Sequence, residues 1–336
     1  MKDYLYEVIP IRLFLIVLLV FYHAFCIFSG AWSPILGYPE IPLYSILDKL
    51  SYACLLETFV FISGYILGYQ VKKKGVLALS AKSIFLKKFN RLIIPSILFS
   101  FLYILLFGNI KQPILQTLYS IINGVGHMWF LPMLFWCFVG VYILEKLQIK
   151  YKIAIGLLFC MMFFSIIPLP LRIGSSFYYL FFFYVGYLLQ KYNYKIVDNK
   201  YSFTLFLFLF FVVFILKMQL PRFNGEEITL LTIFIYASSR LIRVLCASLG
   251  IFILFFLSTR IIKQVTINWK ELLYLSDCCF GVYLFQQFIL LFIYQSEFPL
   301  IFNPYVLPWF SFVLSLIISI LLTIILRKTK AGRLIL

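Results

Sequence analysis

Residues 11–29 read IRLFLIVLLVFYHAFCIFS, an apolar run in which Arg12 and His23 are the strongly polar side chains. A helix needs about 20 mostly apolar residues to cross the roughly 30 Å hydrocarbon core of a bilayer. The run is therefore long enough for one crossing. Because it is long and no small-residue cleavage site follows a short apolar segment, we expect a retained first span rather than a signal peptide.

The composition of the whole chain extends this conclusion to a polytopic membrane protein. The 336 residues are 64% hydrophobic and 12% charged, and the mean hydropathy is +1.03. Soluble domains hold about 25% charged residues, so a soluble fold could not bury this much apolar surface. The apolar runs do not alternate with polar residues as the strands of a barrel do. We therefore expect an all-α integral membrane protein.

Apolar windows between polar breaks predict about ten transmembrane helices in a single polytopic domain that covers residues 1–336. The spans are expected near 11–29, 51–69, 91–108, 127–144, 153–167, 174–190, 201–217, 229–257, 273–294 and 309–326. The eighth is longer than one crossing and contains Arg240 and Arg243. It is either a broken helix or an interfacial segment followed by a span.

The basic residues predict the orientation of these helices, and they account for the net charge of +17. With a cytoplasmic amino terminus, about 21 Lys and Arg residues fall on inner segments and about five on outer ones, as the positive-inside rule requires. The outer residues are Lys49, Lys111, Arg172, Lys217 and Arg222. Both termini are thus predicted to be cytoplasmic, in a multi-pass protein of the cytoplasmic membrane with lipid as a partner. A nucleic-acid partner is not expected, because such proteins gather their basic residues on one face or tail.

Arg12, His23 and Glu57 are ionisable residues inside predicted spans, where each costs about 2.5–3.5 kcal/mol at the bilayer centre and so needs a partner or a task. Arg12 and His23 are eleven residues apart, which returns to the same helix face within about 20°. One alternative is that Arg12 only anchors the helix at the surface and His23 is a bonded core residue. Glu57 needs a proton, a cation or His23 beside it.

Two further segments have both a structural and a functional interpretation. Ser63 precedes Gly64 and Gly68, whose spacing favours close helix packing. Lys88 and Arg91 open the third span, and they either anchor lipid headgroups or hold the phosphates of a cytoplasmic cofactor.

The remaining polar candidates are in the later spans. His127 and Trp129 stand at the predicted outer end of the fourth span. Tyr283, Gln286 and Gln287 share the ninth span, where amides require partners from other helices. Two histidines without a third ligand, and seven cysteines without a Cys-x-x-Cys spacing, predict no metal site.

Taken in order, these motifs make the chain similar to the acyltransferase 3 family of membrane O-acyltransferases. The segments that resemble the family's motifs are Arg12 with His23, Phe59–Tyr65, Lys88 and Arg91 before Pro95, His127-x-Trp129, and Phe280–Phe285. The chain departs from the family pattern at Gln286, where the late motif often ends in His.

The resemblance implies a ten-helix domain that transfers an acetyl or other short acyl group from cytoplasmic acetyl-coenzyme A, or another acyl-coenzyme A, to a hydroxyl across the membrane. The acceptor would be a cell-surface polysaccharide or its lipid-linked glycan precursor. His23, Glu57 and His127 are then the expected catalytic residues, with His23 as the base or a briefly acylated group. Arg12, Lys88 and Arg91 would bind the coenzyme phosphates. Ser63, Trp129, Tyr283 and Gln286 are candidates for substrate contact or packing.

Two alternatives of other classes remain at this point. A glycan exporter or flippase of the same family would also need a polar path, and it should show paired broken helices. A purely structural membrane subunit would tolerate replacement of Arg12 and His23. A second copy of the chain is a further candidate partner.

Overall fold

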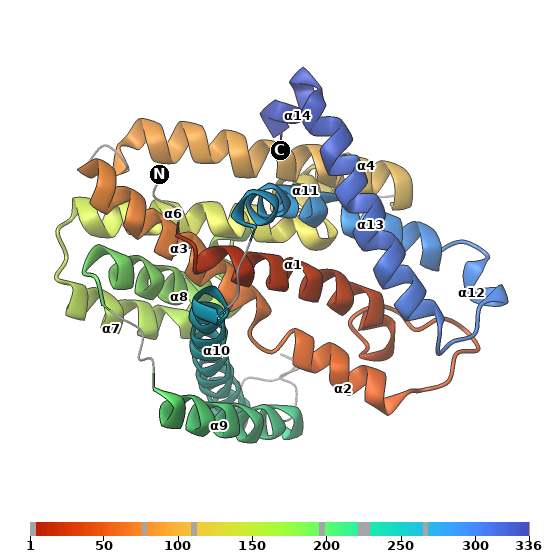
Figure 1. Cartoon of the computed structure of the whole chain (residues 1–336), viewed down its shortest axis with the longest axis horizontal. Coiled ribbons are helices and arrows are strands. Elements are labelled where there is room, and N and C mark those ends of the chain that lie inside the picture. Colours follow the sequence, from red (N-terminus) through yellow and green to blue (C-terminus); the bar gives the residue numbers. More distant parts are fainter. Residues whose placement is uncertain are drawn as a thin grey trace. The chain divides into compact units, whose positions relative to one another are not determined.

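The computed structural model describes residues 5–75, 79–108, 113–194, 199–220, 229–264 and 268–335. Throughout these ranges the regular elements are helices (Figure 1), which confirms the all-α prediction. Lys111 and Arg222, two of the residues used to predict orientation, lie outside the described residues.

The α-helices are α1 (Val8–Phe25), α2 (Pro42–Ser51), α3 (Leu55–Lys74), α4 (Ile94–Phe107), α5 (Ile114–Asn123), α6 (Phe130–Lys146), α7 (Tyr151–Met161), α8 (Ile173–Lys191), α9 (Lys200–Gln219), α10 (Leu230–Gln264), α11 (Trp269–Tyr294), α12 (Phe298–Ile301), α13 (Leu307–Lys328) and α14 (Lys330–Ile335). Short 3₁₀ segments are η1 (Cys26–Phe28), η5 (Gly126–Trp129), η6 (Met162–Ile166) and η7 (Pro170–Arg172). Two π-helical segments, η3 (Lys82–Lys87) and η4 (Phe89–Ile93), precede α4.

Within the described chain, eight helical segments are long and apolar enough to cross a membrane. They are Val8–Phe28, Pro42–Lys74, Ile84–Phe107, Gly126–Lys146, Lys200–Gln219, Leu230–Gln264, Trp269–Tyr294 and Leu307–Lys328. The predicted fifth span corresponds to Tyr151–Ile166, which is apolar but shorter. The sixth forms α8, which is not one of the eight. The membrane class is therefore supported, whereas the count of ten and the orientation stay predictions.

The eighth predicted span is one continuous helix, α10, of 35 residues. This corrects the alternative of a broken helix at that position. Arg240 lies over the ring of Tyr236, 4.9 Å from its centroid, and so its cation has an aromatic partner on the same helix. At 1.5 Å per residue α10 is about 50 Å long, so it extends beyond the hydrocarbon core or tilts within it.

Two amphipathic helices, α2 and α5, lie between the predicted spans. Pro42 begins α2, where a missing N–H costs nothing. Leu43, Ile46, Leu47 and Leu50 then recur at helical spacing. Each helix has only ten residues, which is too short to cross a bilayer, so a search for long apolar runs does not find them.

The described residues cluster into two compact units. The first comes from Met1–Leu56 and Ile196–Leu334, and in it α1 contacts α2, α10, α11 and α13, while α9 packs on α10. The second comes from Glu57–Lys195, with α8 in contact with α6, α7 and η6. The prediction of a single domain over residues 1–336 is not tested by this clustering.

Glycines allow α3 and α8 to pack closely in the second unit. A Cβ on Gly64 would overlap the carbonyl oxygen of Phe183, and one on Gly68 that of Tyr187. Gly186 of α8 meets the backbone of Phe61 in the same way. The sequence prediction that Gly64 and Gly68 admit a neighbouring helix is confirmed, and that helix is α8.

Candidate functional site

His23 is buried near the end of α1, with 7% of its surface exposed. Its Nδ1 atom lies 3.1 Å from Oε1 of Gln286 on α11. With Oε1 as the acceptor, Nδ1 is the ring nitrogen that carries the proton, because an amide oxygen only accepts hydrogen bonds. The lone pair is then on Nε2, the form that a general base requires.

Aromatic rings surround the imidazole. The His23 ring centroid lies 5.0 Å from that of Tyr22 and 6.0 Å from that of Trp32. Tyr294 donates a hydrogen bond to the backbone oxygen of Ala24, the next residue along α1. His23 therefore sits in an enclosed, largely apolar environment.

Gln286 of α11 is in contact with two other helices, α1 and α13. It is fully buried, and its backbone oxygen accepts a 2.9 Å hydrogen bond from Ser315 of α13. Its side-chain Nε2 is buried and has no hydrogen-bond partner among the described residues. A buried donor of this kind needs an acceptor, which a bound substrate can supply.

Arg12 stands at the other end of the same helix pair. Its guanidinium donates to the backbone oxygen of Ser276, 3.3 Å away at the start of α11. The side chain of Arg327 lies 3.8 Å from the carboxylate of Asp277 in the same region. Arg12 and His23 thus both face α11, with cations gathered at the Arg12 end.

Glu57 and Ser63 belong to α3, in the second unit. Glu57 is 1% exposed, and the hydroxyl of Tyr178 on α8 donates to its Oε1 at 3.1 Å. Ser63 donates to the backbone oxygen of Phe59 one turn earlier, as a packing residue does. The pairing of Glu57 with His23 stays a prediction.

His127 and Trp129 lie in η5, at the start of α6. His127 is buried, with 5% of its surface exposed. The Trp129 ring is 6.1 Å from that of Tyr179. Ser96 of α4 donates to the backbone oxygen of Met128, between them, and so fixes this turn.

Lys88 and Arg91 lie on the π-helical stretch before α4. Lys88 is half-buried, with its Nζ 4.1 Å from the centre of the Phe138 ring, whereas Arg91 is exposed. π-helical turns are rare and are frequent at functional sites. The stretch presents an accessible guanidinium that can bind phosphate in a bidentate manner.

Tyr283 shares α11 with Gln286, and its ring stacks on Phe280 at 6.3 Å. Three site features had no clear sequence signal. These are Gln286 as the partner of His23, Tyr178 as the partner of Glu57, and the cavity beside Tyr22 described below. The sequence predicted that Gln286 needs a partner from another helix, but it did not identify that partner, which is 263 positions away. In the described residues no group of three or more His, Cys, Asp or Glu side chains could hold a metal ion.

The fold and these buried polar pairs define a helical membrane protein with ionisable residues in its interior. A family model described as an acyltransferase domain, that of the acyltransferase 3 family, matches residues 6–328. The chain belongs to this family and is a membrane acyltransferase, as the motifs predicted. Comparisons with curated proteins and with solved structures found no significant match.

Proposed function

We propose that this chain is an O-acetyltransferase of the cytoplasmic membrane. It moves an acetyl or another short acyl group from cytoplasmic acyl-coenzyme A to a hydroxyl of a cell-surface polysaccharide or its lipid-linked precursor. The observation that supports this proposal best is the buried pair formed by His23 and Gln286.

His23 is the proposed general base. Its Nε2 removes the proton of the acceptor hydroxyl while the hydroxyl oxygen attacks the carbonyl carbon of the thioester. The carbon–sulfur bond then breaks, and the leaving thiolate receives the proton from Nε2. The imidazole returns to its starting form, so protons and charge balance. Burial of His23 keeps water from taking the place of the acceptor.

Gln286 orients the base in this proposal. Its Oε1 holds the imidazole in the Nδ1–H form, which leaves Nε2 as the basic nitrogen. The amide lies on the Nδ1 side of the ring, away from the nitrogen that meets the acceptor hydroxyl, so Gln286 acts through His23.

The donor is proposed to bind through Arg12, Lys88 and Arg91. Cations of this kind suit coenzyme phosphates, and Arg91 is exposed on its π-helical turn. Glu57 and His127 remain the other proposed catalytic residues, since both are buried ionisable groups inside apolar helices. Membrane lipid and the glycan acceptor are the proposed partners.

No observation favours the exporter over the enzyme. The eighth span was the feature that suggested a broken transport helix, and α10 is continuous there. The His23 and Gln286 pair, by contrast, has the chemistry of a base that is already oriented.

Transfer of label from radiolabelled acetyl-coenzyme A to cell glycan, in membranes that contain the protein, tests the proposal. His23→Ala and His23→Gln should each lower the transfer rate by about a hundredfold or more, because a general base contributes about 10²–10⁴. Cys160→Ser, at an exposed thiol of α7, is the matched control for expression and insertion. Full transfer by well-inserted His23→Gln protein would contradict the proposed base.

A further inference from the structure

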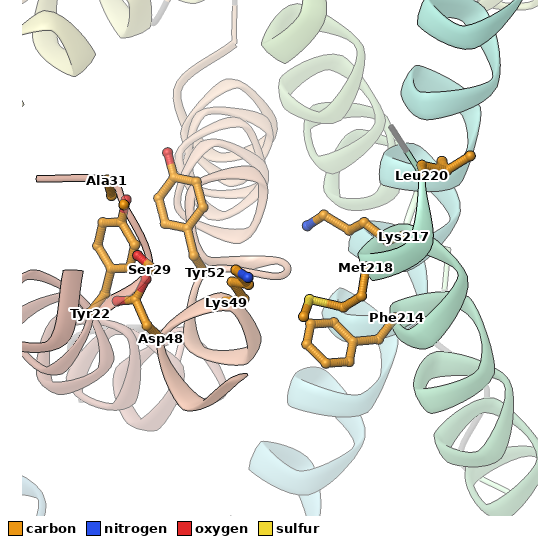
Figure 2. Close-up of a pocket in the computed structure, with 11 residues that line it drawn as sticks. Tyr22, Ser29, Ala31, Asp48, Lys49, Tyr52, Phe214, Lys217, Met218 and Leu220 are labelled. Carbon is orange, nitrogen blue, oxygen red and sulfur yellow. The ribbon is translucent and has the colours of Figure 1, made fainter. Parts of the chain in front are cut away.

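A cavity of 390 Å³ lies in the first unit, near the end of α1 that holds His23 (Figure 2). Its lining includes Tyr22, Ser29, Asp48, Lys49, Tyr52 and Lys217. These residues come from α1, from the segment that follows η1, from α2 and its end, and from α9. Pockets for small molecules usually measure about 300–1,000 Å³, so the cavity has room for a small ligand.

The cavity is joined to the candidate base through Tyr22. The ring of Tyr22 stacks on Tyr52, with centroids 4.3 Å apart, and lies 5.0 Å from the ring of His23. A ligand that rests on Tyr22 is therefore one aromatic ring away from the imidazole. The flat faces of tyrosine also suit the apolar C–H face of a sugar ring.

The charged side chains of the cavity favour an anion. Lys49 of α2 and Lys217 of α9 contribute two cations against one carboxylate, that of Asp48. Figure 2 shows Lys217 extending from its helix toward the side of Lys49 and Tyr52. Both lysines are half-buried, where a charge pair is less screened than in open water.

Asp48 adds a site for a hydroxyl group. It is 1% exposed, and its Oδ1 is buried without a hydrogen-bond partner in the described part of the chain. The hydroxyl of Ser29, which also lines the cavity, donates to the backbone oxygen of Cys26. A buried carboxylate oxygen needs a donor, and the hydroxyl of a ligand can provide one.

We infer that this cavity binds a sugar unit of the glycan acceptor next to the unit whose hydroxyl meets His23, and that the bound unit is an acidic sugar: a ring with free hydroxyls and a carboxylate or phosphate group. Tyr22 and Tyr52 border the sugar ring, Lys49 and Lys217 pair with the anionic group, and Asp48 accepts from a hydroxyl. Both lysines belong to the predicted outer side, which is where a surface glycan is reached. The inference rests on the proposed function only where it calls the bound sugar part of the acceptor. Binding of the sugar itself does not depend on acyl transfer.

Binding of glucuronate and of glucose to the full-length protein in detergent, measured by saturation-transfer NMR titration without an acyl donor, tests this inference. The two sugars differ in one carboxylate. Glucuronate should bind about tenfold more tightly, which corresponds to about 1.4 kcal/mol. In Lys49→Gln/Lys217→Gln the preference should vanish while glucose binding is retained.

Lys49→Arg/Lys217→Arg is the matched control, because it keeps both charges, and it should retain the preference. Three results would overturn the inference. The wild type could bind the two sugars equally, it could fail to bind glucuronate, or the preference for glucuronate could survive in Lys49→Gln/Lys217→Gln.

His23→Gln separates this inference from the proposed function. That variant should keep the preference for glucuronate while it loses acyl transfer. If the wild type prefers glucuronate but transfers no acyl group, the proposed function is overturned and the sugar site stands. If the wild type transfers the acyl group but shows no preference for glucuronate, the sugar site is overturned and the proposed function stands.

Discussion

At the scale of single residues, the interior of this protein is organised by pairs between helices. His23 pairs with Gln286, and Glu57 accepts from Tyr178. Each polar group would be costly if it were buried alone, so each pair is a condition of folding as well as a resource for chemistry. Gln286 and Asp48 each keep one buried polar atom without a hydrogen-bond partner in the described residues.

Gln286→Met and Gln286→Glu test whether Gln286 orients His23. Methionine removes the acceptor for Nδ1–H, whereas glutamate keeps an acceptor oxygen. A general base contributes about 10²–10⁴, so loss of its orientation in Gln286→Met should lower kcat by about a hundredfold, and Gln286→Glu should lose less. Steady-state kinetics of label transfer, with KM for the donor as the internal control, measures both values. A Gln286→Met enzyme with wild-type kcat would contradict this role of Gln286.

At the scale of helices, small residues allow the close packing that places these pairs. Along α13, Ser311, Ser315, Ser319 and Thr323 recur every four residues and are fully buried. A Cβ on Gly281 of α11 would overlap the Thr323 side chain, so this stripe faces α11. Close helix approach through small and hydroxyl residues is typical of membrane interiors. It is also what brings Ser315 to the backbone of Gln286.

Gly64→Ala should destabilise the packing of α3 on α8, because the new methyl group would overlap the backbone of Phe183. The expected loss is about 1–3 kcal/mol, as for other overpacked interiors. Gly156→Ala is the matched control, since a Cβ there meets nothing within 4 Å. It should be neutral or stabilise α7 by about 0.5–1 kcal/mol. Thermal unfolding in detergent compares the two, and an unchanged Gly64→Ala midpoint would count against this packing.

For the molecule as a whole, the first unit has two chemically distinct ends. The hydrogen bonds from Arg12 to Ser276 and between His23 and Gln286 show that α1 and α11 run in the same direction. The contact of Arg327 with Asp277 and the hydrogen bond from Ser315 to Gln286 together show that α13 runs opposite to α11. These helices correspond to the first, ninth and tenth predicted spans. If successive spans cross the membrane in alternating directions, the first and ninth run the same way and the tenth runs the opposite way, as the contacts show. One end therefore holds Arg12 and Arg327, and the other holds His23.

Fusions of a fluorescent protein or of alkaline phosphatase test the predicted orientation. After Leu336, the fluorescent protein should be bright and the phosphatase inactive, because the carboxyl terminus is predicted to be cytoplasmic. After Asn303, between α12 and α13, the pattern should reverse. Active phosphatase at the carboxyl terminus would invert the orientation, and with it the side on which Lys49 and Lys217 meet their ligand.

The sequence by itself determined that the chain is helical and belongs in a membrane, which family it belongs to, and the approximate position of each long helix. Those properties follow from local composition and short motifs, because a bilayer requires about 20 apolar residues for each crossing wherever they occur. The tertiary structure alone decided that His23 meets Gln286, that Glu57 meets Tyr178, and that Tyr22, Asp48 and Lys217 line one cavity. Such contacts join residues far apart in the chain, and they depend on how closely the helices pack, which no local pattern specifies.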